Sequence, residues 1–283
     1  MDVIDEKDLP FSQRTGLVSI PPQLALGKVS DELRRLLWYA VHSDLETCLK
    51  WGSHHQFVSD YWVDILRDVN VRVMKKMPDE FGKEASQNIK ALRAIFETYS
   101  IGSLFDFVEF LLSHWQTPMS LKASLASAFV EARAAYRVVD AKRIIAVGNE
   151  HQADSIIGAL IATSAQGARG SRAHLIEAAA CLRVGEWADS VRESIHAVEA
   201  IAVDIAPDNR TLGSALSEIE KQGHLHGALK TAFSNLYGYT SDEEGVRHAL
   251  VLSEKANVDE ADALFMLGAC ASFVTFLTMR RSQ

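Results

Sequence analysis

Apolar residues recur three and four positions apart along residues 186–205, the clearest amphipathic period in this chain. They are Trp187, Val191, Ile195, Val198, Ala202 and Ile205. Because an α-helix turns once every 3.6 residues, this spacing gathers the apolar side chains on one face. Such a helix must bury that face against other elements. The period therefore predicts a helical bundle in this part of the chain.

Helical periods fill most of the remaining sequence, which holds only six prolines and sixteen glycines. Further helices are predicted over 31–50, 58–77, 84–99, 104–115, 120–135, 150–163, 211–221, 226–237 and 259–279, with a shorter piece at 246–252. Two β-branched runs separated by Asp140-Ala141-Lys142 predict one short β-hairpin at about 136–147. Asn149 is a suitable N-cap for the helix that follows. We therefore predict a mostly α fold.

A chain of 283 residues is long enough for two modest domains. Small residues at 164–171, with the sequence SAQGARGS, favour either a hinge or a short turn between helices. We place the domain boundary there. Residues 1–165 then form an N-terminal helical domain that contains the hairpin, and residues 166–283 form a C-terminal helical bundle.

The overall composition is that of a globular protein, with 48% hydrophobic and 23% charged residues. The formal net charge of −8 argues against a protein that coats nucleic acid, although it leaves a local basic cleft open. Residues 67–93 hold seven lysines and arginines against four acids. That local excess indicates either a surface that guides RNA by phosphate contacts or simply the solvated face of helices.

The cysteines and histidines show no metal-binding spacing. The three cysteines are Cys48, Cys181 and Cys270, far apart and in apolar contexts, as expected of buried, reduced thiols in a cytosolic protein. His42 and the pair His54-His55 flank Cys48 without a Cys-x-x-Cys or His-Glu-x-x-His pattern, so no metal site is predicted. Phosphate-binding and dinucleotide-binding glycine motifs are also absent from the sequence, so no cofactor is predicted.

One segment has the composition of a membrane helix. Residues 263–279 carry no charge over 17 positions, and Arg280 and Arg281 follow. This length is at the short limit for a membrane span. A helix that is apolar all round is more often buried in a bundle or at a subunit interface, so we predict no membrane association. The acidic start of the chain, MDVIDEKDLP, is unlike a secretory signal.

Residues 236–249, with the sequence LYGYTSDEEGVRHA, hold the most reactive pair of side chains. Arg247 is a permanent cation with a planar fork of donors, and His248 can change its charge near neutral pH. The two could bind a phosphate and move a proton, which suits cleavage of a phosphodiester. Alternatively, Arg247 pairs with Asp242 or Glu243 while His248 caps a helix.

Neighbouring residues supply candidate supporting roles. Asp242 could orient the imidazole and raise its pKa. Tyr237 and Tyr239 could stack on a base. Alternatively, Gly238 and Ser241-Asp242 build a turn that packs the tyrosines in the core. Arg192 and Glu199 lie on the polar flank of the helix at 186–205, where they either bind substrate or form a solvated face.

Several C-terminal segments resemble the HEPN domain of bacterial abortive-infection proteins. They are SVRESIHAVEAI (190–201), TLGSALSEIEKQG (211–223), HGALKTAFSNLYGYTSDEEGVRHAL (226–250) and VDEADALFMLGACASFVTFL (258–277), and they place the resemblance at 186–280. HEPN ribonucleases are generally dimers that cut RNA without a metal, the ribose 2′-hydroxyl attacking its own phosphate. Here the arginine that usually precedes the histidine by several residues is missing, and Arg247 is adjacent to His248 instead.

The N-terminal half resembles an AbiJ-type N-terminal domain over 11–165. The matching fragments are FSQRTGLVS, ELRRLLWYAV, FDFVEFLL and AYRVVDAKRIIAVGNEHQADSIIGAL. The two resemblances imply an antiphage endoribonuclease of the bacterial cytoplasm that acts on RNA as a homodimer through its C-terminal domain. They also imply a phage trigger or a neutralising partner. The alternative is a catalytically inactive HEPN-like dimer that binds RNA or a protein partner.

Overall fold

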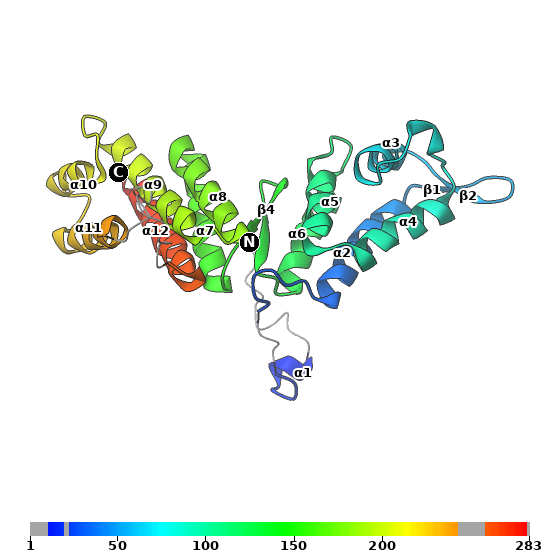
Figure 1. Cartoon of the computed structure of the whole chain (residues 1–283), viewed down its shortest axis with the longest axis horizontal. Coiled ribbons are helices and arrows are strands. Elements are labelled where there is room, and N and C mark those ends of the chain that lie inside the picture. Colours follow the sequence, from blue (N-terminus) through cyan, green and yellow to red (C-terminus); the bar gives the residue numbers. More distant parts are fainter. Residues whose placement is uncertain (1–10, 20–22, 243–257, 282–283) are drawn as a thin grey trace, which may run out of the picture. The chain divides into compact units, whose positions relative to one another are not determined.

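Helices dominate the computed structural model, which describes residues 11–19, 23–242 and 258–281 (Figure 1). The prediction of a mostly α chain with a short hairpin is confirmed. The chain divides into two compact units, Met1–Ile144 and Ile145–Gln283. The two units meet within the predicted hairpin, before the domain boundary predicted after residue 165. That boundary stays a prediction.

The first unit is built from six α-helices among its described residues. They are α1 (Phe11–Arg14), α2 (Asp31–Glu46), α3 (Tyr61–Asp68), α4 (Ala85–Thr98), α5 (Ile101–Ser113) and α6 (Met119–Glu131). Large aromatic side chains fill its core. Phe96 of α4 meets Phe107 of α5 edge to face with ring centroids 5.5 Å apart, and both are almost fully buried. Edge-to-face pairs of this kind add stability beyond the apolar area that they bury.

The predicted helices at 31–50 and 58–77 are too long, because a second hairpin lies between them. Strands β1 (Leu49–Trp51) and β2 (Gln56–Val58) pair antiparallel, and the Gly52 amide donates to the His55 carbonyl across the turn. Helix α3 then begins at Tyr61 and continues as a π-helical turn, Val69–Val73. A strand of only three residues next to a helix has too few residues to show its own periodicity, so the sequence pattern predicts it as part of the helix.

The hairpin predicted at 136–147 is confirmed as strands β3 (Tyr136–Val139) and β4 (Arg143–Ala146). Its turn residues Asp140 and Ala141 both have positive φ, at 53° and 52°. This backbone twist matches that of paired strands in a two-residue turn. The predicted cap is also present, because the Asn149 side chain accepts a hydrogen bond from the Gln152 amide at 3.0 Å.

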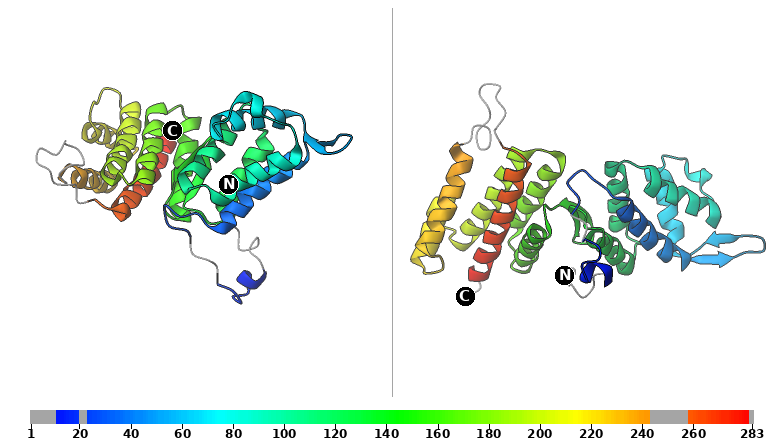
Figure 2. Two further views of the ribbon diagram at one scale, coloured as in Figure 1. Left: turned by 45° about the vertical axis from the view of Figure 1, so that its right-hand side comes forward. Right: turned by 90° about the horizontal axis from the view of Figure 1, so that it is seen from below.

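The second unit is a bundle in which α12 (Glu260–Arg281) packs against α7 (Glu150–Ala165), α8 (Arg169–Val184) and α9 (Trp187–Ile205) (Figure 2). Helices α10 (Leu212–Lys221) and α11 (Gly227–Asp242) lie beside α9. By length and composition alone α12 could cross a membrane, yet half of its apolar window is buried inside the bundle. It therefore supplies the core of this unit, and the absence of a membrane stays a prediction.

Helix α8 was not predicted from the sequence. Residues 166–168 form a short turn between α7 and α8, which is the second of the two alternatives for 164–171. At the other end of α8, Gly185 adopts φ of 82° and the Glu186 amide donates to the Cys181 carbonyl at 3.0 Å. This glycine-terminated cap reverses the chain, so that α8 and α9 form a helical hairpin.

All three cysteines, Cys48, Cys181 and Cys270, are buried and free, as predicted. Complete burial raises the pKa of the Cys270 thiol to about 12. The thiol therefore stays protonated at neutral pH and behaves as a small apolar side chain of the α12 core.

Replacing Gly185 with alanine should lower the free energy of unfolding by about 1–2 kcal/mol, because a side chain at positive φ clashes with its own backbone. Urea unfolding followed by circular dichroism measures the change. A matched control is Gly158→Ala within α7, where a new Cβ meets nothing within 4 Å. That substitution should stabilise the chain by about 0.5–1 kcal/mol. Equal effects of the two variants would contradict the turn geometry.

Candidate functional site

The predicted catalytic pair, Arg247 and His248, lies outside the described residues. Asp242 is the last residue of α11, and its side chain is likewise not described. The structure therefore does not test this part of the site, and all three roles stay predictions.

Tyr237 lies within α11 and is half-buried. The helix continues through Gly238 to Asp242, so the turn considered at Gly238 and Ser241-Asp242 is wrong. A glycine inside a helix costs only about 1 kcal/mol relative to alanine, and the surrounding helical residues offset that cost. The stacking role of Tyr237 stays a prediction.

Arg192 and Glu199 both make structural contacts in α9. Arg192 pairs with Asp189 one turn earlier on the same helix. The Glu199 carboxylate accepts a hydrogen bond from the Leu212 amide at 3.3 Å, at the start of α10. Because the first amides of a helix have no partner within the helix, this contact stabilises the α9–α10 connection. Their roles in substrate binding stay predictions.

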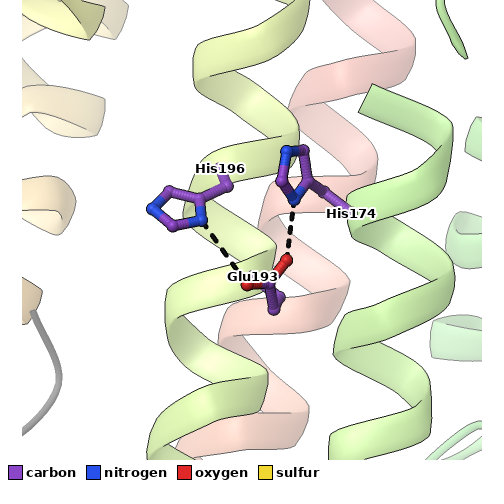
Figure 3. Close-up of side chains that lie close together, drawn as sticks. All are labelled: His174, Glu193 and His196. Carbon is purple, nitrogen blue, oxygen red and sulfur yellow. Dashed lines mark hydrogen bonds and ion pairs between the residues drawn. The ribbon is translucent and has the colours of Figure 1, made fainter. Parts of the chain in front are cut away.

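A cluster of two histidines and a glutamate lies on the face shared by α8 and α9 (Figure 3). His174 comes from α8, and its Nδ1 atom lies 2.7 Å from Glu193 Oε2. His196 follows Glu193 by one turn of α9, and its Nδ1 atom lies 3.6 Å from Glu193 Oε1. The two imidazole rings meet edge to face at 5.3 Å. One carboxylate thus lies between two imidazoles.

Close packing of α8 against α9 fixes the position of this cluster. The Ser190 hydroxyl donates to the Ala178 carbonyl on the facing helix at 2.8 Å, and both residues are completely buried. His174 lies one helical turn from Ala178 on α8, and Glu193 lies one turn from Ser190 on α9. Because the helices run antiparallel through the Gly185 turn, these two side chains meet.

The electrostatic surroundings of the cluster are acidic. The pKa of the neighbouring Cys181 thiol is raised, first by burial and then by the negative charges of Glu177, Glu186 and Glu193. Arg192 has the opposite, smaller effect on this thiol. Glu193 therefore lies on a hairpin that also carries Glu177 and Glu186.

The cluster was not predicted from the sequence, although two of its three members show a recognisable spacing. Glu193 and His196 are three residues apart on a predicted helix, a Glu-x-x-His spacing that metal-binding helical bundles use. The third member, His174, lies on the helix that was not predicted. Among the described residues this is the one group of histidine, cysteine and acidic side chains whose atoms, all within 4.8 Å of one another, could hold a metal.

The basic residues at 67–93 are all exposed. Three of them pair with acids on their own helical turns: Arg67 with Asp64, Arg72 with Asp68, and Arg93 with Glu97. Exposed pairs of this kind contribute little stability and occupy the charge that would contact phosphate. Both alternatives for this surface, the solvated face of helices and an RNA-guiding surface, stay predictions.

Comparison with known proteins assigns the N-terminal part of the chain. Residues 9–161 match the family model described as AbiJ N-terminal domain 4. No curated protein and no solved structure matches the chain. The match covers the first unit from residue 9 onward together with most of α7, and it includes the predicted hairpin.

Replacing Glu199 with alanine should lower the free energy of unfolding by about 1 kcal/mol, because the Leu212 amide loses its acceptor. Urea unfolding measures this change. The control is Glu218→Ala on α10, whose exposed pair with Lys221 should contribute less than about 0.5 kcal/mol. An unchanged stability of the Glu199 variant would contradict a stabilising contact with the Leu212 amide.

Proposed function

This chain belongs to the AbiJ N-terminal domain 4 family, and we propose that it is an antiphage endoribonuclease whose C-terminal half cuts RNA. Membership of the family indicates a role in abortive infection. The match, which covers more than half of the chain, is the observation that carries the proposal. The cleavage chemistry rests on Arg247 and His248.

The proposed reaction needs a proton acceptor and a group that binds the phosphate. His248 takes the proton from the ribose 2′-hydroxyl, which then attacks its own phosphate. Arg247 stabilises the negative charge that develops on the phosphate oxygens. Asp242 orients the imidazole, and Tyr237 stacks on a base. The reaction uses no metal. As the 2′-oxygen bonds to phosphorus, the bond from phosphorus to the 5′-oxygen of the next nucleotide breaks, so one product carries a 2′,3′-cyclic phosphate and the other a protonated 5′-hydroxyl.

We propose that two chains pair through their C-terminal halves, because one arginine and one histidine per chain are few for this chemistry. Large apolar side chains exposed on the second unit support this pairing. Phe265 and Met279 of α12 and Ile161 of α7 are each more than half exposed. Gly268 and Ser272, four residues apart on α12, are small enough to let a partner helix approach, but Gly268 is approached by Gln152 of the same chain.

The N-terminal unit is then the part that recognises a phage trigger or a neutralising partner. Trp51 and Trp115 are more than three-quarters exposed on this unit. Exposed tryptophans are enriched in the energetically dominant positions of protein interfaces. The unit thus offers apolar anchors for a partner, in the bacterial cytoplasm where infection proceeds.

Replacing Arg247 or His248 with alanine should reduce RNA cleavage on the order of 10²–10⁴-fold, because each removes a group that acts in the transition state. The assay uses purified chain, labelled RNA and phage lysate, and a phage-challenge assay tests protection in cells. Arg192→Ala and His151→Ala are matched controls and should be much milder.

The assay also separates the two candidate functions. Full activity of His248→Ala, or loss of cleavage by the metal-free chain in EDTA, would contradict the proposed chemistry. If the wild-type chain cuts no RNA in the presence of phage lysate, the inactive dimer that binds RNA or a protein becomes the better account. Light scattering at micromolar concentration should give the mass of two chains, and a monomer would contradict the dimer.

A further inference from the structure

We infer that His174, Glu193 and His196 form a zinc site that links α8 to α9. The inference goes beyond the proposed function and does not depend on it, because the proposed RNA cleavage uses other residues and no metal. It rests on the types of the three side chains, the distances between them, their access to solvent and the acidic charge around them.

The three side chains are a ligand set that zinc uses. Two imidazole nitrogens and one carboxylate oxygen are the protein ligands of several zinc enzymes, in which water takes the fourth position. Sites of this composition favour zinc and neighbouring transition metals over calcium or magnesium, which prefer oxygen ligands. The Glu193 and His196 pair has the i, i+3 spacing that directs both side chains to one side of a helix.

The distances need little adjustment to hold an ion. Zinc bonds of about 2.0–2.2 Å place tetrahedral ligand atoms about 3.3 Å apart. Here His174 Nδ1 lies 2.7 Å from one Glu193 oxygen, and His196 Nδ1 lies 3.6 Å from the other. All the candidate ligand atoms lie within 4.8 Å of one another. Small rotations of side chains that belong to two packed helices bring them to the required spacing.

Exposure of the cluster is intermediate, which suits an exchangeable ion. The side chains of His174 and His196 are 38% and 40% exposed, and that of Glu193 is 20% exposed. A metal ion and its bound water can therefore reach the imidazoles, while the carboxylate stays held between the helices. Figure 3 shows both imidazoles turned toward this carboxylate from the two helices.

The charge around the cluster also favours a cation. Burial first, and then the charges of Glu177, Glu186 and Glu193, raise the pKa of the Cys181 thiol on α8, so Glu193 is one of three carboxylates that contribute negative potential to this hairpin. Arg192 has the opposite, smaller effect on this thiol, and it is paired with Asp189. A divalent cation would reduce the mutual repulsion of these carboxylates.

A hydrogen-bonded cluster without metal is the competing account. The 2.7 Å contact between His174 and Glu193 satisfies one carboxylate oxygen without any ion. The two accounts differ in what zinc does. A bound ion bridges two helices in the folded chain, so it raises the temperature of unfolding as its concentration rises. A hydrogen-bonded cluster gives no such dependence.

The test uses the full chain, stripped with EDTA, dialysed, and then titrated with zinc chloride. Equilibrium dialysis with metal analysis should give one zinc per chain. Cobalt(II) in place of zinc should give the visible absorption of a four-coordinate site. At a hundredfold excess over the dissociation constant, the midpoint of thermal unfolding should rise by about 5–10 °C.

Three variants, His174→Ala, Glu193→Gln and His196→Ala, should each lose the bound zinc and the thermal shift. His151→Ala on α7, an exposed histidine outside the cluster, is the matched control and should keep both. Circular dichroism of the metal-free variants checks their folding, and the partly exposed His196 variant remains informative if another fails to fold.

No zinc uptake by the wild-type chain, or uptake that all three variants retain, would overturn the inference. An RNA-cleavage assay of the metal-free chain distinguishes failure of the zinc site from failure of the proposed function. Cleavage that persists in EDTA together with zinc-dependent stability supports both proposals. Cleavage without any zinc binding would contradict only the proposed metal site. Zinc binding without cleavage would contradict only the proposed ribonuclease activity.

Discussion

The contact between Ser190 and the Ala178 carbonyl sets the geometry of the C-terminal unit. Only small side chains let two helix backbones approach closely enough for a hydroxyl on one to reach a carbonyl on the other. The approach is fixed at one end by the left-handed Gly185. Every side chain one turn from this contact then has a defined neighbour, and His174 meets Glu193 for that reason.

Helix α12 completes the same unit by burying apolar surface. It carries no charge between Asp262 and Arg280, and it packs against α7, α8 and α9 at once. Burial on several sides requires a helix that is apolar nearly all round, which is also the composition of a membrane span. Met266, Leu267 and Val274 are buried, so α12 supplies apolar side chains to the core of this unit.

Two histidine chemistries are therefore proposed for one C-terminal half. His248 acts with a neighbouring arginine, and its chemistry follows from residue types that are adjacent in the sequence. The cluster around Glu193 depends on the packing of two helices, because only that packing brings His174 to Glu193. The two proposed roles have different physical requirements. Proton transfer needs an imidazole that can change its charge near neutral pH, whereas a metal ligand needs an imidazole held in place by a neighbouring group.

The sequence by itself determined the helical class, the hairpin at 136–147, the Asn149 cap and the burial of the cysteines. Each follows from local periodicity, turn residues or composition, which act between near neighbours. Only the tertiary structure decided the early end of α2, the continuation of α11 through Gly238, and the meeting of His174 with Glu193. Those outcomes depend on which helices pack together, and packing is set by contacts between residues far apart in the chain.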